Sequence, residues 1–597
     1  MRYARQHSLF SVRWLSAALP LCAALAMGCH GKVGDVGMSG TGGNIGLGGA
    51  AGMDVPCSGA SDPRLAVASQ RIMLLTKAEV VNTVRYLVDD TEATALVNSG
   101  AFQITSFTEQ HFPPADGEET NINPTSILPL ANLAEHVGNY VTMNFAAVTK
   151  CTTATDSCAQ TYLNALAAKA YRRALTADES QRFTALYTTL KSQVVNNYLV
   201  TTTVEQATGY SVFALMMSPQ LMWRWEHGGT QTTSGPAGVY LTDAELASQL
   251  SFFLTDRPPD DMLLAAANAG TLRANLASHV SRILQTPTAR AWLRDVMELY
   301  FLINQLPAVP IDGAKFPAFD NGMIASMFTD VEMFLDKVLW TGQLNDLLTS
   351  KSAFVNTRLA TDIYKIPTPG GATLDNFVEV QLPADQRAGI LTNPAFLTSR
   401  GRSDGLGLVI PRGKTVKAAF LCLPTAAPDL SKIGPQVEAA KAQFATLTGQ
   451  EQVAERAKVP LCKECHGTFD SYGLVLEFFD NLGIYRTNYA ELMNMPAIDG
   501  HTTLPDVLGG ATVNNAVELA TNLTTSPTFT NCMATSMLQF AMTELASPVE
   551  LPLPPTQSGC AAADVVQKYQ SGSAKTFSGL LTAITQSPAF VVRKAAP

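Results

Sequence analysis

Apolar residues recur at helical spacing through most of the chain after about residue 70. In the segment 75–87 they fall on one face, and Thr76 followed by Glu79 three residues later has the form of a capping box. The same threonine-to-glutamate spacing recurs at Thr176 and Thr242. The pattern therefore predicts a mainly α fold, a multi-segment helical body.

Two stretches depart from this regular pattern. Residues 353–380 lose the helical period and contain β-prone pieces, so we expect minor β structure around 350–410. Ser218-Pro219 is expected to restart a helix that carries Trp223 and Trp225. These two indoles could gate a ligand, but aromatic residues in such a run are expected to pack in the core.

The 597 residues are too many for one hydrophobic core, so several folding units are expected. A Gly/Ser/Thr-rich linker at 231–238 and the loss of helical period after 350 suggest where the boundaries lie. We expect an N-terminal helical domain (69–230), a second helical domain (231–350), a mixed segment (351–435) and a C-terminal module (436–597).

The N-terminus has the features of an export signal. Arginines precede an apolar run that ends in small residues before Cys29, which resembles a bacterial lipobox. We therefore expect a signal peptide at 1–28, a lipid anchor on Cys29 and a glycine-rich tether at 29–68. Because the residue after Cys29 is His30 rather than aspartate, we expect the lipid-anchored protein to reside at the outer membrane. The alternative is a plain secretory signal with a free Cys29.

The formal net charge is −9, and no basic stripe is present to neutralise phosphates, which excludes a nucleic-acid partner. The densest basic patch is Arg400, Arg402, Arg412 and Lys414. It could pair with anionic groups of a cofactor or an acidic partner, but we expect solvated loop charge.

The pentapeptide Cys462-Lys463-Glu464-Cys465-His466 is the attachment pattern of c-type haem. The two thiols can add across the haem vinyl groups, and His466 then serves as an axial iron ligand. The predicted cofactor is haem c, and the C-terminal module (436–597) becomes a candidate cytochrome c-like domain. Half of a zinc site, a redox-active thiol pair and an ordinary disulfide are the alternatives.

An electron carrier also needs a second axial ligand and partners for the haem propionates. Met495 is our first candidate ligand because it lies in a Met-Pro loop downstream of the attachment site. His501 is the second choice, and Met533 or Met537 the third. Arg486 is the candidate propionate partner. Buried walls are expected from neighbouring apolar residues, namely Leu461, Phe469, Tyr472, Leu474, Phe478 and Phe479.

The cysteine count is compatible with this assignment. Once the signal peptide, an acylated Cys29 and the two haem cysteines are set aside, six cysteines remain, an even number suited to disulfides. Cys151 and Cys158 bracket a short turn and are expected to be bonded. The other disulfide candidates are Cys57, Cys422, Cys532 and Cys560.

Several segments in order resemble those of planctomycete-type cytochrome c-like exported proteins built of consecutive domains of unknown function, here as a bacterial lipoprotein. These are Leu75-Thr76, Tyr171 to Thr176, Glu245 to Leu254, Arg387 to Thr392, Arg412 to Lys414, and Cys462 to His466 followed by Gly473, Glu477, Gly483 and Arg486. The resemblance implies an exported helical protein with a C-terminal haem-c-like module. It does not imply any particular reaction.

Together these features predict a cell-envelope haem protein in electron transfer or haem-dependent oxidoreduction, with an unknown redox or surface protein partner. One alternative is a structural or interaction lipoprotein in which Cys462 and Cys465 only form a disulfide. Another is a haem peroxidase with an open iron site.

Overall fold

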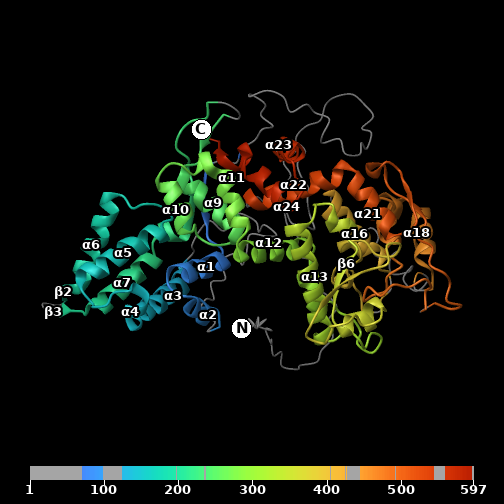
Figure 1. Cartoon of the computed structure of the whole chain (residues 1–597), viewed down its shortest axis with the longest axis horizontal. Coiled ribbons are helices and arrows are strands. Elements are labelled where there is room, and N and C mark those ends of the chain that lie inside the picture. Colours follow the sequence, from blue (N-terminus) through green and yellow to red (C-terminus); the bar gives the residue numbers. More distant parts are fainter. Residues whose placement is uncertain are drawn as a thin grey trace. The chain divides into compact units, whose positions relative to one another are not determined.

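Helices dominate the computed structural model, which confirms the mainly α prediction (Figure 1). The structure describes residues 70–98, 124–195, 198–233, 237–403, 407–423, 446–490, 492–542 and 558–594, and the single residues Val67, Gly405, Thr425 and Phe444. The predicted signal peptide, Cys29, Cys57 and all of the tether except Val67 lie outside this part of the chain, and so does the side chain of Cys560. No helix in the described part is both long enough and apolar enough to cross a bilayer.

The N-terminal region packs around the helices α3 and α7. Its buried core draws on residues 74–222 together with Phe252. Gly138 and Gly209 allow the backbones of these two helices to approach, since a Cβ on Gly138 would lie 2.6 Å from the Gly209 carbonyl oxygen. The elements are β1 (Arg71–Leu74), α1 (Lys77–Leu87), α2 (Asp90–Asn98), α3 (Pro124–Met143), α4 (Phe145–Thr149), α5 (Asp156–Ala170), α6 (Ala177–Lys191), β2 (Ser192–Val195), β3 (Tyr198–Thr201), α7 (Val204–Met216), α8 (Pro219–Met222) and β4 (Trp223–Glu226).

The sequence predicts a helix after Ser218-Pro219, and this prediction is wrong beyond the first turn. Helix α8 ends at Met222, and the chain continues as strand β4, which pairs antiparallel with β1. Strand geometry sends alternate side chains to opposite faces, so Arg224 is buried while Trp225 is 39% exposed. The expectation that Trp225 packs in the core is therefore also wrong.

A buried charge network joins β1 and β4 to the last described strand of the chain. Glu226 accepts from Arg71 at 2.9 Å and from the fully buried Arg593 at 2.5 Å, while Arg224 pairs with Glu79 at 3.0 Å. Burial by itself would raise the pKa of Glu226, but the surrounding guanidinium groups hold it at about 2. These paired charges connect residues from both ends of the described chain.

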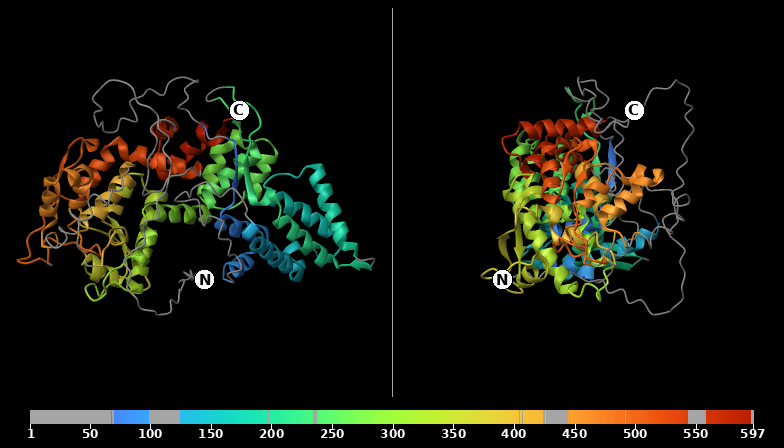
Figure 2. Two further views of the ribbon diagram at one scale, coloured as in Figure 1. Left: turned by 180° about the vertical axis from the view of Figure 1, so that it is seen from behind. Right: turned by 90° about the vertical axis from the view of Figure 1, so that its right-hand side faces the viewer.

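The second and larger core runs from residue 241 to residue 590. In Figures 1 and 2 the red C-terminal helices lie beside the green helices of the middle of the chain, and α11 contacts α24. The elements of its first half are β5 (Val239–Tyr240), α9 (Asp243–Thr255), α10 (Asp261–Asn268), α11 (Leu276–Leu284), α12 (Pro287–Tyr300), α13 (Asn321–Thr341), α14 (Asp346–Thr349), β6 (Ser352–Val355), β7 (Val378–Gln381) and α15 (Pro394–Thr398).

The second half of this core continues to the C-terminal strand. Its elements are α16 (Val409–Leu421), α18 (Gly449–Lys458), α19 (Pro460–His466), α20 (Asp470–Leu474), β8 (Thr502–Thr503), β9 (Thr512–Val513), α21 (Ala516–Thr525), α22 (Pro527–Met542), α23 (Ser558–Ser571), α24 (Phe577–Thr585), α25 (Pro588–Val591) and β10 (Val592–Arg593). Between helices lie the 3₁₀ segments η1 (Arg273–Asn275), η2 (Ile303–Ala308), η4 (Ile390–Thr392) and η5 (Asp506–Leu508), and the π-helical segment η3 (Leu359–Tyr364).

The β structure consists of two-stranded antiparallel pairs. The pair β6–β7 confirms the minor β structure expected around 350–410. The sequence did not predict the pairs β1–β4, β2–β3, β5–β10 and β8–β9. Strand β5 follows the 231–238 linker and pairs with β10, which ties this linker to the C-terminal end of the described chain.

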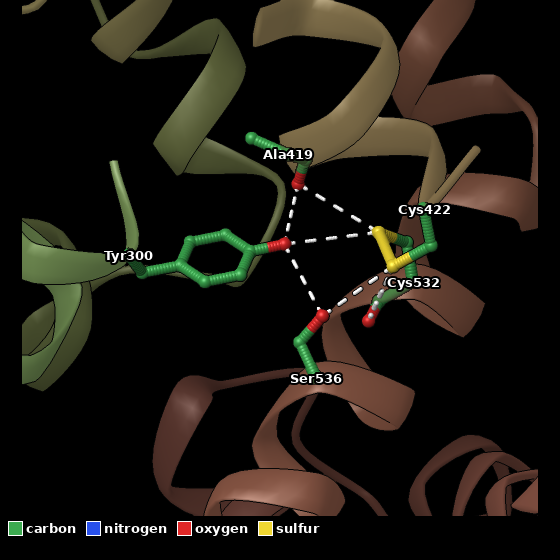
Figure 3. The surroundings of a disulfide bond; sticks show 5 residues. All are labelled: Tyr300, Ala419, Cys422, Cys532 and Ser536. Atoms are coloured by element: carbon green, nitrogen blue, oxygen red, sulfur yellow. Dashed lines mark hydrogen bonds between the residues drawn. A yellow bond between two sulfur atoms is a disulfide. The ribbon is translucent and has the colours of Figure 1, made fainter. Parts of the chain in front are cut away.

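Two disulfides are present in the described part of the chain. The predicted bond between Cys151 and Cys158 is confirmed, and Cys422 is bonded to Cys532. The second bond joins the C-terminal end of α16 to α22, and the hydroxyls of Tyr300 and Ser536 lie beside its sulfur atoms (Figure 3). It therefore fixes one end of helix α16, which packs against α20, the helix that follows the pentapeptide.

Candidate functional site

Helix α19 presents the two thiols of the pentapeptide. Pro460 at its first turn suits a helix start, and the i, i+3 spacing places Cys462 and Cys465 on the same side. Both cysteines are half-buried and unbonded, although two other cysteine pairs in the described chain are bridged. Burial raises the pKa of Cys465, against the opposing influence of Lys417 and Lys414.

Two glycines position α20, the helix that follows the pentapeptide, against the rest of the core. Helix α20 follows α19 after a short turn and packs on α16. A Cβ on Gly473 would lie 1.9 Å from the Val409 carbonyl oxygen, and one on Gly413 would lie 2.3 Å from the Phe469 carbonyl oxygen. Only glycine allows the two backbones to approach this closely. This explains why glycine occupies positions 413 and 473, which both lie in segments that resemble the family.

The imidazole of His466 is oriented by a buried carboxylate. Its Nδ1 lies 3.1 Å from Oδ1 of Asp470, and Oδ2 of Asp470 accepts from Nε of Arg456 at 2.7 Å. Asp470 and Arg456 are both buried, whereas the side chain of His466 is 23% exposed. Within the described part of the chain Nε2 of His466 makes no hydrogen bond. The arrangement leaves Nε2 as the nitrogen available to a metal.

Helix α16 places two lysines close to this site. Lys417 is buried, and its ammonium donates to the hydroxyl of Thr468 at 3.0 Å. Burial lowers the pKa of Lys417, and Cys465 opposes that shift. Lys414 lies one turn earlier and is exposed. The sequence did not single out Lys417, Arg456 or Asp470, although the four-residue spacing from His466 to Asp470 was visible.

The structure does not bring a second axial ligand to His466 within the described residues. Met495 lies in a turn with a φ of 42° and is 60% exposed. His501 directs its Nδ1 to Asn514 Oδ1 at 3.0 Å. Met533 and Met537 are fully buried in α22. The distal ligand stays a prediction.

Arg486, the candidate propionate partner, lies against Glu477. Its Nη2 is 3.6 Å from a carboxylate oxygen of Glu477, its Nε donates to the Glu477 backbone oxygen at 3.0 Å, and its guanidinium lies over the ring of Tyr489. Its propionate role is likewise a prediction.

The basic patch differs from the solvated loop charge that the sequence suggested. Arg412 is fully buried and donates to the backbone oxygens of Leu476, Phe479 and Asp480. Arg400 is also buried, and it donates to the Phe301 carbonyl and to the Thr415 hydroxyl. Burial lowers the pKa of Arg412 to about 10. Of these four residues only Arg402 and Lys414 are exposed, so the four do not form a basic patch on the surface.

The expected apolar walls lie largely within the core. Phe469, Tyr472, Leu474 and Phe479 are all buried, and the ring of Phe469 lies 5.1 Å from that of His466. The buried hydroxyl of Tyr472 has no hydrogen-bond partner in the part of the chain that the structure describes. Among the residues that the structure describes, no group of three or more histidine, cysteine or acidic side chains is arranged to hold a metal ion.

The residues fit the attachment half of a c-type haem site, since two unbonded thiols precede a histidine whose Nε2 makes no hydrogen bond within the described part of the chain. Cys462 and Cys465 would hold the group covalently and His466 would hold its iron.

Two consecutive parts of the chain match families of unknown function. Residues 241–366 match the family PSD4, proteins of unknown function (DUF1592), and residues 387–489 match the family PSCyt3, proteins of unknown function (DUF1588). These matches confirm the resemblance to planctomycete cytochrome c-like domain families in consecutive arrangement. The second match contains the pentapeptide, Gly413 and Gly473. No curated protein and no solved structure matches the chain.

Proposed function

We propose that the segment 387–489 carries a covalently bound c-type haem and that the protein transfers electrons in the cell envelope. The observation that carries the proposal is the pairing of His466 Nδ1 with Asp470 beside two unbonded cysteines. A carboxylate on Nδ1 fixes the tautomer and ring orientation of a histidine ligand and makes Nε2 a stronger donor to iron. The match to PSCyt3 supports the same conclusion.

Each residue has a distinct part in this proposal. The thiols of Cys462 and Cys465 would each add across one vinyl double bond, with sulfur forming the new bond to one carbon and the hydrogen going to the other. His466 would bind iron through Nε2, and Asp470 would hold the imidazole in place with the help of Arg456. The bound group supplies one-electron redox chemistry.

The proposal includes an anchor at the outer membrane. An acyl chain on Cys29, followed by the glycine-rich tether, would hold the folded part near the bilayer on the periplasmic side or at the cell surface. Replacement of Cys29 by alanine is expected to release the protein from membranes. Retention of the variant in the membrane fraction would contradict the anchor.

Two other functions start from the same residues. A structural or interaction lipoprotein would need Cys462 and Cys465 only as a disulfide, and in the structure they are unbonded. A haem peroxidase would leave the sixth iron position open. It shares the attachment chemistry with the proposal and differs from it in the distal ligand.

The decisive experiment is a haem stain on the full chain after periplasmic maturation and denaturing electrophoresis. We expect a stained band for the wild type and none for the Cys462→Ser/Cys465→Ser variant. The matched control is His279→Ala, which changes a histidine outside the site and should leave the stain unchanged. An unstained wild-type band would refute the proposal.

The role of Asp470 is tested by redox titration of the haem protein. Asp470→Asn removes the negative charge on the imidazole and should raise the midpoint potential while the covalent stain persists. Because this change also leaves Arg456 without its partner, the double variant Arg456→Met/Asp470→Asn serves as the control for unpaired buried charge. Unchanged potentials in both variants would exclude the orienting role.

A further inference from the structure

A pocket of about 370 Å³ opens among α5, β4 and α9, outside the pentapeptide site. Tyr171 at the end of α5, Trp225 on β4 and Ser248 in the second turn of α9 line it. Its volume lies at the lower end of the range for small-molecule pockets. No part of the proposed haem function uses these residues.

The charged groups of the pocket are already engaged. Arg173 forms a two-pronged pair with Glu179, with N–O distances of 2.7 and 2.8 Å. Arg172 is buried and donates to four backbone carbonyls. The Glu245 carboxylate accepts from the backbone nitrogens of Thr242, His227 and Gly228. The hydrogen-bonding atoms of these charged side chains are therefore already engaged, and an ionic ligand would have to displace these bonds to pair with them.

Three neutral polar side chains of the pocket make no hydrogen bond within the described part of the chain. The hydroxyl oxygen of Ser248, a residue only 6% exposed, is buried and has no hydrogen-bond partner among the residues that the structure describes. The side chains of Gln220 and His227 form no hydrogen bond within the described part of the chain. A buried hydroxyl without a partner is costly, and a ligand that supplies a donor or acceptor removes that cost.

An exposed indole provides the apolar surface of the pocket. Trp225 is 39% exposed, and the ring of His227 lies 5.4 Å from it. Ile72, its neighbour in the register of β1 and β4, is 36% exposed. Such an exposed apolar face beside polar groups is typical of a binding site.

We propose that this pocket binds a neutral carbohydrate, with one sugar ring stacked on Trp225 and its hydroxyls bonded to Ser248, Gln220 and His227. A sugar ring has a face of C–H groups that packs on an aromatic ring, and its edge carries hydroxyls that both donate and accept. An aromatic platform, unengaged neutral polar groups and engaged charges match that chemistry better than an anion, a cation or an acyl chain. The inference does not depend on haem.

Binding is tested on the purified full chain by isothermal titration calorimetry. The probes are the neutral oligosaccharides cellohexaose, xylohexaose and chitohexaose, with oligogalacturonate as a charged comparison. We expect at least one neutral probe to bind. Trp225→Ala should weaken that binding about tenfold or more, as expected from the loss of about 1.4 kcal/mol of stacking.

Two further variants separate binding from folding. Tyr210→Ala removes an aromatic side chain that is 50% exposed on α7 and lies outside the pocket lining, so binding should be unchanged. Ser248→Ala should weaken binding several-fold without lowering the melting temperature, because the hydroxyl has no partner to lose among the described residues. If Trp225→Ala fails to fold, Ser248→Ala and Trp225→Phe provide the same test.

Three results would overturn the proposal. They are the absence of binding by every neutral probe, binding by oligogalacturonate alone, and unchanged neutral-probe affinity in folded Trp225→Ala or Ser248→Ala protein.

Discussion

Replacing Gly473 with alanine tests the close packing of α16 on α20, the helix that follows the pentapeptide. The new Cβ would lie 1.9 Å from the Val409 carbonyl oxygen and 2.9 Å from the Val409 Cα. Ordinary contact begins at 3.4 Å, so α20 and α16 would have to separate by about 1.5 Å, a large shift for a close-packed interior. Both close atoms belong to the backbone, so no side chain can turn aside.

The expected cost follows from two opposing effects. Overpacking costs about 1–3 kcal/mol, and a rigid backbone neighbour places this site at the upper end or beyond. Alanine returns about 1 kcal/mol of helix propensity in α20. The net loss in the free energy of unfolding should therefore be about 2 kcal/mol or more.

Equilibrium urea unfolding, followed by circular dichroism, measures this loss. Gly313→Ala is the matched control, because no atom lies within 4 Å of its new Cβ and its φ is not positive. We expect the control to lie within about 0.5 kcal/mol of the wild type. A loss below about 1 kcal/mol for Gly473→Ala would refute the argument that the two backbones require glycine here.

Two further predictions concern a buried carboxyl and the disulfides. Burial raises the pKa of Asp330 to about 6, so its contribution to stability is fully present below its ordinary pKa near 3.8 and is lost as pH rises through 6. The wild type minus Asp330→Asn difference in free energy of unfolding should fall by about 3 kcal/mol from pH 3.5 to pH 7; a difference independent of pH would contradict this. Replacing Cys422 and Cys532 by serine opens a link across 110 residues and should lower the melting temperature more than replacing Cys151 and Cys158, which are 7 residues apart. Equal losses in thermal unfolding scans would contradict the chain-entropy explanation.

Local features of the fold were predictable from the sequence. The capping boxes at Thr76, Thr176 and Thr242 are present as expected, because both partners of each box lie within four residues. The Cys151–Cys158 bond was predictable for the same reason. By contrast, β4 depends on a partner strand about 150 residues earlier, which no local pattern reveals.

In the candidate site, too, the local features were predictable from the sequence and the long-range contacts were not. The pentapeptide identified the thiols and His466, and the spacing to Asp470 could have identified its partner. Arg412 was misinterpreted because its acceptors lie 64 to 68 residues further along the chain. A charged side chain in a glycine-rich stretch looks solvated until the fold supplies three carbonyl oxygens around it.

The ion pair between Glu226 and Arg593 spans 367 residues. A contact of such long range forms slowly because closing a loop of this length costs chain entropy before the contact gives any stabilisation. While the chain emerges from a ribosome or translocation channel, Glu226 lacks this partner until Arg593 has also emerged. Pairing of Glu226 with Arg593 therefore follows release of strand β10, and the pentapeptide emerges before that pair can form.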